Sequence, residues 1–224
     1  MGRDNKNYKF ILFDLDGTLT DPGEGIIKCV QHALLCFGIN EPDTVKLRAF
    51  IGPPLKDSFI KYYGLSEDQS LTAIEKYRER YRPVGIFENR IYDGIKEMLE
   101  LLKMQGKVLA VATTKPTVFA EQIISMYSLD GYFSVISGSE LDGRRTDKAE
   151  VIRYTLDRLD CRDISLAVMV GDRKHDIIGA QKCGISSIAV TFGYAEAGEL
   201  EEAGPDYIVG SVHELKDLLA FHAG

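Results

Sequence analysis

The sequence of 224 residues predicts an α/β fold, in which a doubly wound parallel sheet carries helices on both of its faces. Two features lead to this prediction. Apolar runs of strand length alternate along most of the chain with longer segments of helical spacing, which is the pattern of repeated strand–helix–strand units. Three of the runs are continuously apolar, as is typical of strands buried on both faces of a parallel sheet.

The expected elements begin with a strand at residues 8–13, which ends abruptly at Asp14, and Gly17 follows where the chain leaves the strand. The other segments divide by apolar character into strands and by spacing into helices. Further strands are expected at residues 107–112, 133–136, 165–170, 186–190 and 207–209. Helices are expected at residues 93–104, 116–125, 147–159, 174–183 and 212–221.

One region, from about residue 22 to residue 89, interrupts this alternation. Apolar residues recur there with helical spacing at residues 26–37 and 71–81, and a further helix is expected at 55–63. Pro and Gly at residues 52–54 predict a turn. The sequence therefore predicts a small helical cap, residues 21–89, inserted after the first strand of a Rossmann-like core made of residues 1–20 and 90–224.

Composition narrows the class of protein. The net charge of −7, from 27 Lys+Arg and 34 Asp+Glu, repels nucleic acid, so no polymeric nucleic-acid partner is expected. The cysteines form no Cys-x-x-Cys pair and are interpreted as reduced thiols of a cytoplasmic protein. The polar residues 1–6 do not resemble a signal or myristoylation sequence, and no apolar run approaches the roughly 20 residues that span a bilayer, so no membrane partner is expected.

The segment that carries chemistry follows the first strand. Asp14 and Asp16 stand two residues apart, so that their carboxylates share one side of the extended chain end and can act on one ligand. One of them could attack phosphorus as a nucleophile, while the other gives a proton to the leaving oxygen and later takes one from water. A bare Asp-x-Asp pair is more often a solvated loop, but this pair ends a buried strand and is followed by Gly17 and Thr18.

This Asp-x-Asp-Gly-Thr segment resembles the first motif of the haloacid dehalogenase superfamily, and three further motifs of that superfamily follow in order. The resemblance implies that Asp14 is the nucleophile and Asp16 the acid and base. Thr113, Thr114 and Lys148 are implied to bind the phosphoryl group, although Thr114 stands where many relatives carry Asn. In isolation, Thr113 would be interpreted as a helix cap and Lys148 as a solvated lysine.

The fourth, acidic motif supplies Asp172 and Asp176. Asp14 and Asp172 both end strands at the edge of the sheet where α/β proteins bind ligands. They can therefore bind one metal, and hard oxygen ligands favour Mg²⁺. The resemblance implies that Asp14, Asp172 and the backbone carbonyl of Asp16 hold the ion, and that Asp176 orients Lys148 or a water at the metal.

Within the superfamily, the segments at residues 19–22, 51–55 and 92–94 look like the phosphoglycolate phosphatase and 5′-nucleotidase branch. The resemblance thus implies a Mg²⁺-dependent phosphatase that hydrolyses a small phosphorylated metabolite, of the phosphoglycolate or nucleoside monophosphate type, through an aspartyl-phosphate intermediate. A phosphomutase of the β-phosphoglucomutase type and a non-catalytic phosphate-binding protein are the alternatives. The sequence does not decide the substrate, the oligomeric state or the cap residues that set specificity.

Two groups of charged residues have a weaker interpretation. Arg48 and Lys56 of the cap could meet the distal group of a substrate, although solvated or packing roles are commoner for such residues. The acidic segment at residues 196–202 is interpreted as a solvated loop or the start of a helix.

Overall fold

The structure is a computed structural model, and it describes residues 7–220. The N-terminal residues 1–6 and residue 221, the predicted end of the last helix, lie outside this range. The chain forms two compact units: one contains Met1–Leu19 and Ile91–Gly224, and the other contains Thr20–Arg90. Over residues 7–220, no helix combines the length and apolar character needed to cross a membrane.

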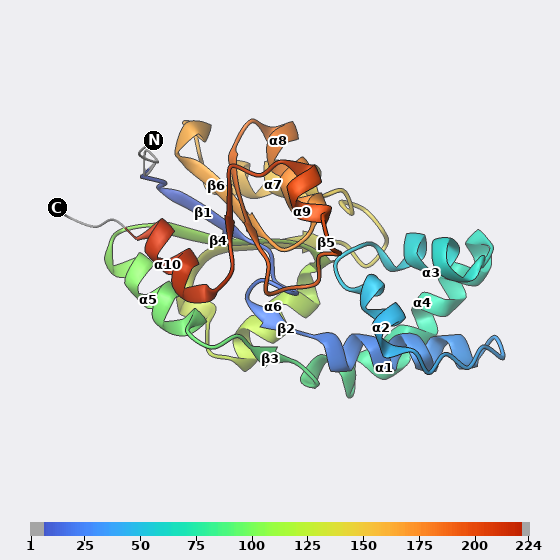
Figure 1. The fold of residues 1–224 in the computed structure, drawn as a ribbon. Coiled ribbons are helices and arrows are strands. Elements are labelled where there is room, and N and C mark those ends of the chain that lie inside the picture. Colours follow the sequence, from blue (N-terminus) through green and yellow to red (C-terminus); the bar gives the residue numbers. More distant parts are fainter. Residues whose placement is uncertain (1–6, 221–224) are drawn as a thin grey trace. The chain divides into compact units, whose positions relative to one another are not determined.

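The larger unit, the core, is built on a six-stranded sheet with the order β5-β4-β1-β6-β7-β8, in which all neighbouring strands are parallel (Figure 1). The predicted α/β fold with a Rossmann-like sheet is confirmed. The strands are β1 (Phe10–Phe13), β4 (Val108–Pro116), β5 (Phe133–Ser139), β6 (Ala167–Gly171), β7 (Ser186–Val190) and β8 (Tyr207–Val209).

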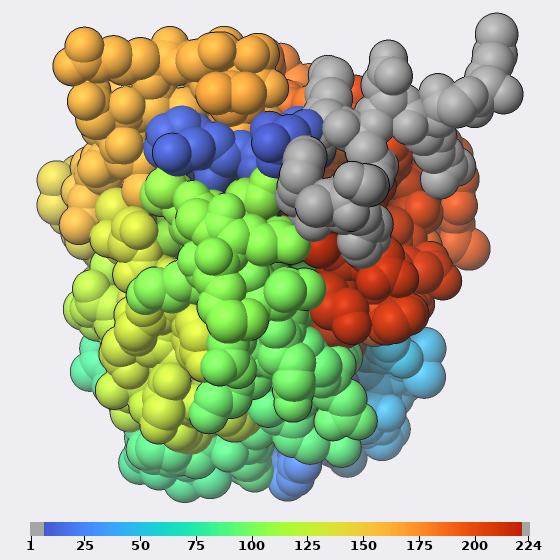
Figure 2. All heavy atoms as spheres, turned by 90° about the vertical axis from the view of Figure 1, so that its left-hand side faces the viewer, coloured from blue at the N-terminus to red at the C-terminus, as the bar shows by residue number. Residues whose placement is uncertain are grey.

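Helices cover both faces of this sheet. Helices α7, α8 and α9 lie on one face, and α5, α6 and α10 lie on the other (Figure 1). Figure 2 shows α5 in green beside α10 in red on the second face. The bounds are α5 (Ile95–Met104), α6 (Thr117–Met126), α7 (Lys148–Arg158), α8 (Lys174–Cys183), α9 (Glu199–Ala203) and α10 (Val212–Leu219), with short 3₁₀ turns η3 (Asp130–Tyr132) and η4 (Ile164–Leu166).

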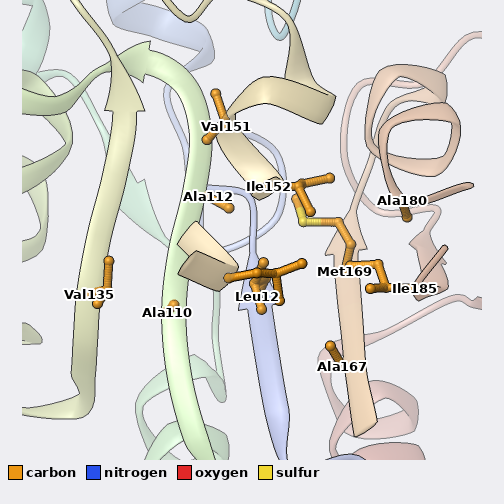
Figure 3. Close-up of a cluster of buried hydrophobic side chains, with 11 residues drawn as sticks. Leu12, Ala110, Ala112, Val135, Val151, Ile152, Ala167, Met169, Ala180 and Ile185 are labelled. Carbon is orange, nitrogen blue, oxygen red and sulfur yellow. The ribbon is translucent and has the colours of Figure 1, made fainter. Parts of the chain in front are cut away.

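The hydrophobic core fills the space between α7 and the middle strands. Figure 3 shows Val151 and Ile152 of α7 over Leu12 of β1 and Met169 of β6, and all four side chains are fully buried. Burial of a side chain of this size contributes about 1.5 to 3 kcal/mol to the free energy of unfolding. This packing fixes β1, and with it the backbone that leads into Asp14.

Strand β1 lies between β4 and β6 and leads directly into Asp14. Phe13, the last residue of β1, lies between Val111 of β4 and Val170 of β6. The backbone N–H of Asp14 then donates to the carbonyl of Val170 at 2.9 Å. The residues that follow β1 and β6 and those at the end of β4 therefore meet at one edge of the sheet, as expected for parallel strands.

Strand β4 differs from its prediction, because it continues past residue 112 to Pro116. Its pairing with β5 shifts register between Ala112 and Pro116, and Pro116 then lies opposite Ser139. The polar residues between them predict a loop, but this irregular pairing keeps them in the strand. Strand β6 in turn begins at Ala167 rather than at residue 165, because the side chain of Asp163 accepts the N–H of Ser165 and starts the turn η4.

The smaller unit is mainly helical. Its elements are β2 (Thr20–Asp21), α1 (Gly23–Leu35), α2 (Thr44–Leu47), η1 (Arg48–Phe50), α3 (Leu55–Tyr63), α4 (Glu67–Tyr81) and η2 (Gly85–Phe87). Helix α4 begins four residues before its prediction because Ser66 and Gln69 form a capping box. Strand β2 pairs with β3 (Arg90–Ile91) in a two-stranded sheet, which was not predicted.

Two contacts shape the inside of the smaller unit. Gly25 of α1 lies against η2 so closely that an added Cβ would come within 2.1 Å of the carbonyl oxygen of Gly85. The ring of Phe50 packs against Phe59 and Tyr62, with centroid distances of 5.0 and 5.8 Å. Such aromatic contacts join η1 to α3.

Candidate active site

Three carboxylates meet at the edge of the core sheet. Asp14 follows β1, Asp172 follows β6, and Asp176 lies in the first turn of α8. Each residue contributes one carboxylate oxygen, and these three oxygens all lie within 4.8 Å of one another. The exposed fractions are 4% for Asp14, 0% for Asp172 and 1% for Asp176, so all three are shielded from water.

Lys148 is the cation of this cluster. It is the first residue of α7, where the side chain of Asp147 caps the helix by accepting the N–H groups of Ala149 and Glu150. Its Nζ lies 2.8 Å from Oδ1 of Asp14 and 2.7 Å from Oδ1 of Asp176. Burial alone would lower the pKa of Lys148, but the two carboxylates outweigh it and raise that pKa, so the lysine is charged.

The electrostatics of the cluster fit a divalent cation. Burial, followed by the charges of Asp176 and Asp14, raises the pKa of Asp172 well above its usual value. Burial also raises the pKa of Asp176 to about 6, although Lys148 opposes this shift. One lysine does not neutralise three buried carboxylates, and hard oxygen donors of this kind suit Mg²⁺.

Close packing of two loops holds Asp172. The backbone N–H of Tyr194 donates to Oδ2 of Asp172 at 2.8 Å, and the hydroxyl of Thr18 donates to Oδ1 at 3.4 Å. A Cβ at Gly17, which has φ +88°, would lie 2.1 Å from Oδ2 of Asp172, and one at Gly193 would lie 2.4 Å from its Cβ. Glycine is therefore required on both sides of this carboxylate.

A second layer of charges connects α8 to the loop that carries Tyr194. The guanidinium of Arg173 donates to both carboxylate oxygens of Glu199, at 2.9 and 3.1 Å. Glu199 also accepts the backbone N–H groups of Lys174 and Glu196. Glu199 is 9% exposed, so the interpretation of this acidic segment as solvated is wrong for Glu199, although α9 does begin there.

Asp16 is not part of the carboxylate cluster. It is 7% exposed, and its Oδ2 forms an ion pair with Nζ of Lys115 on β4. Burial raises the pKa of Asp16, while Lys115 opposes that shift. The sequence motifs do not identify Lys115, and the signal that indicates it is a basic residue two positions after Thr113, at the edge where the motifs meet.

The predicted phosphate-binding threonines lie on β4. Thr113 is 2% exposed, and its Oγ1 accepts the backbone N–H of Lys115 at 3.3 Å. The carbonyl oxygen of Thr114 accepts the hydroxyl of Ser139 at 2.7 Å, which ties β4 to β5. The carbonyl oxygen of Ala112, the residue before Thr113, accepts a hydrogen bond from Nζ of Lys148 at 3.0 Å. Thr113 therefore follows directly after Ala112, whose carbonyl oxygen binds Lys148. The phosphate-binding roles of Thr113 and Thr114 stay predictions.

Comparison with known proteins finds relatives that match almost the whole chain. A 5′-nucleotidase from Pseudomonas aeruginosa is 46% identical over 215 residues, which cover 96% of this chain and 97% of that protein. The tyrosine-protein kinase PtkA of Mycobacterium tuberculosis is 35% identical over 213 residues, or 94% of this chain and 72% of the kinase. The crystal structure of a predicted phosphatase from Clostridium acetobutylicum matches with a TM-score of 0.91 at 48% identity, covering 94% of this chain and 97% of that one.

The family model of the haloacid dehalogenase-like hydrolases matches residues 11–190, a range that includes every residue of the carboxylate cluster and both buried lysines. The resemblance found in the motifs therefore extends over most of the chain, and this chain belongs to the haloacid dehalogenase-like hydrolases.

Proposed function

We propose that this protein is a Mg²⁺-dependent phosphatase that hydrolyses a small phosphorylated metabolite through an aspartyl-phosphate intermediate. One observation carries the proposal: the buried carboxylate of Asp14 lies within 4.8 Å of those of Asp172 and Asp176 and is paired with Lys148, whereas Asp16 is paired with a different lysine, Lys115. This arrangement supports two different roles for two neighbouring aspartates, one as nucleophile and one as acid and base.

In the first step, a carboxylate oxygen of Asp14 bonds to phosphorus while the bond from phosphorus to the leaving oxygen breaks. Asp16 gives its proton to that oxygen, so the alcohol leaves neutral. In the second step, Asp16 takes a proton from water, whose oxygen bonds to phosphorus and releases Asp14 and inorganic phosphate. Lys148 and Thr113, with Thr114, hold the phosphoryl oxygens, and the ion pair of Asp176 with Lys148 supports a positioning role for Asp176.

The metal would be held by Asp14, Asp172 and the backbone carbonyl of Asp16. When bound, Mg²⁺ offsets the repulsion between the carboxylates and the anionic substrate. The excess of negative charge in the cluster, described above, supports this assignment.

For the substrate, we propose a nucleoside 5′-monophosphate, and phosphoglycolate is the second candidate. The support is the 5′-nucleotidase of P. aeruginosa, which shares 46% of its residues with this chain over almost its full length. PtkA, by contrast, is named a tyrosine-protein kinase, so its substrate is a tyrosine of a protein and not a small metabolite. Because the two relatives differ in this way, an assay has to identify the substrate.

The test is release of inorganic phosphate from p-nitrophenyl phosphate, phosphoglycolate and a panel of nucleoside monophosphates. We expect activity with Mg²⁺, its loss in excess EDTA, and its return when Mg²⁺ is restored. Asp14→Asn should reduce turnover to below a few per cent of wild type, because an amide is a poor nucleophile. Full activity in EDTA, or substantial activity of Asp14→Asn, would contradict the proposal.

The same assay separates the alternatives. A phosphomutase needs an activating bisphosphate and releases no free phosphate. A non-catalytic phosphate-binding protein releases none from any ester, with or without Mg²⁺.

A further inference from the structure

Lys115 is a buried lysine at the end of β4. Its side chain is 6% exposed, and that of its ion-pair partner Asp16 is 10% exposed. An unpaired charge at this depth would be strongly destabilising, so the two groups depend on each other. The pair also joins β4 to the segment that follows β1, since the two residues are far apart in the sequence.

The two oxygens of Asp16 have different surroundings. Oδ2 is paired with Lys115, whereas Oδ1 is buried and accepts no hydrogen bond from any residue in the range 7–220. A buried oxygen without a partner is unusual in a folded protein and needs an explanation. Contact with a substrate is one such explanation, because it would supply the missing partner.

The two catalytic aspartates are also bound by different lysines. Asp14 is bound by Lys148 of α7 and Asp16 by Lys115 of β4. The Asp16 carboxylate is therefore kept out of the cluster of Asp14, Asp172 and Asp176. Among residues 7–220, Lys115 is the hydrogen-bond partner of the Asp16 side chain, so it fixes the direction of the carboxyl group.

We propose that Lys115 is a positioning residue, which holds Oδ2 of Asp16 so that Oδ1 delivers the proton to the leaving oxygen of the substrate. The inference rests on the proposed function, in which Asp16 is the acid. As the bond from phosphorus to the leaving oxygen breaks, its electron pair stays on that oxygen and takes the Asp16 proton. Lys115 keeps its own protons throughout.

The competing explanation is that Lys115 only neutralises a buried carboxylate. The two explanations differ in how the reaction depends on the leaving group. p-Nitrophenolate is a stable anion and leaves without a proton, whereas the phenolate of phenyl phosphate leaves far more readily when it is protonated. A lysine that only stabilises the fold affects both esters equally, but one that aims the acid affects phenyl phosphate more.

The experiment compares kcat/KM of Lys115→Met for these two esters, which differ only in the nitro group. This ratio reports the steps up to formation of the phosphoenzyme, so slow hydrolysis of the intermediate does not obscure it. We expect kcat/KM for phenyl phosphate to fall at least tenfold more than that for p-nitrophenyl phosphate. Lys115→Arg, which keeps the charge, should recover part of the difference.

Lys107→Met is the matched control. Lys107 stands just before the other end of β4, and its Nζ donates to the carbonyl of Tyr8 at 2.7 Å. This substitution should change both esters by the same factor. If Lys115→Met also changed both by the same factor, the positioning role would be wrong, while activity of the wild type on both esters would leave the proposed function intact.

Two further measurements cover a variant that does not fold. Lys115→Gln keeps a polar side chain, but its amide nitrogen lies one bond nearer to Cα than Nζ of lysine and so does not hold Oδ2 of Asp16 in the same place. It should shift the ratio of the two esters in the same direction, and an unchanged ratio would overturn the inference. In single turnovers, Lys115→Gln should shift the ratio no further in an Asp16→Asn background, because the lysine acts through Asp16. An additive effect in that background would also overturn the inference.

Discussion

The burial of Asp172 beside two other carboxylates lowers the stability of the metal-free protein. Its pKa is raised well above the usual value by burial and by Asp176 and Asp14. At neutral pH, the ionised carboxylate is therefore less favourable in the folded chain than in the unfolded one, so it lowers the free energy of unfolding of the metal-free protein. A cation bound at the proposed metal site would reverse this effect.

Replacement of Asp172 by Asn tests this balance. In the metal-free protein, Asp172→Asn should melt at or above the temperature of the wild type, because the amide removes the repulsion yet can still accept the N–H of Tyr194. At a Mg²⁺ concentration of 100 times Kd, the wild type should gain about 2.7 kcal/mol, or about 5 to 10 °C. Asp172→Asn should gain almost nothing.

Thermal melts with and without Mg²⁺ measure both quantities. Asp142→Asn, at an exposed carboxylate, is the control and should keep the full shift with Mg²⁺. A full Mg²⁺ shift in Asp172→Asn would show that the ion binds elsewhere.

At this scale the sequence predicts part of the site. The motifs identify Asp14, Lys148, Asp172 and Asp176, and the structure brings these four together. Lys115 could not be predicted in the same way, because its contact with Asp16 depends on the irregular pairing of β4 beyond Ala112. No period in the sequence encodes such a register shift.

At the scale of elements, Glu199 connects α9 to the first turn of α8. By binding Arg173 and the N–H groups of Lys174 and Glu196, it fixes the loop whose Tyr194 N–H reaches Asp172. Residues that orient a metal ligand without touching the metal commonly change the affinity for the metal by roughly 10- to 100-fold.

Glu199→Gln should therefore raise the half-saturating Mg²⁺ concentration about tenfold. The amide keeps the shape of the side chain but loses the charge that holds Arg173. Glu201→Gln, at an exposed position of the same helix, is the control. Titration of activity with Mg²⁺ gives the half-saturating concentration for each variant. Equal concentrations for Glu199→Gln and Glu201→Gln would mean that the contacts of Glu199 do not influence metal binding.

The elements that the sequence predicts well are those with clear helical spacing or a compact apolar run. Helices α3 and α8 and strands β7 and β8 have the predicted bounds. The two-residue strands β2 and β3 and the four-residue helix α2 are too short to show a period, so they were not predicted. The end of β4 was missed because its residues are polar and their place in the sheet comes from pairing with β5.

At the scale of the whole molecule, the question is what the inserted unit contributes. We expect it to select substrates, because it contains no residue of the four motifs yet supplies polar side chains such as Arg48 and Lys56. Arg48→Ala and Lys56→Ala should change kcat/KM for one phosphate ester several-fold more than for another. Nζ of Lys56 lies 3.0 Å from a carboxylate oxygen of Glu67, so Lys56→Ala also tests whether this ion pair contributes to kcat/KM.

Lys76→Ala is the matched control, because Lys76 and Lys56 are both 37% exposed and both pair with a glutamate. It should change all esters by the same small factor. If the Arg48 and Lys56 variants behaved like this control over the whole substrate panel, specificity would have to come from the loops of the core.

The pairing of β2 with β3 has a consequence for how such proteins can diversify. Paired strands lie about 5 Å apart, so the points where the chain leaves and rejoins the core are already neighbours. Closing a loop of different length between fixed neighbouring ends changes the free energy only slowly with length. A recombination event that exchanged the segment between these strands would thus leave β1 and its register untouched, and new substrate ranges could arise without rebuilding the core sheet.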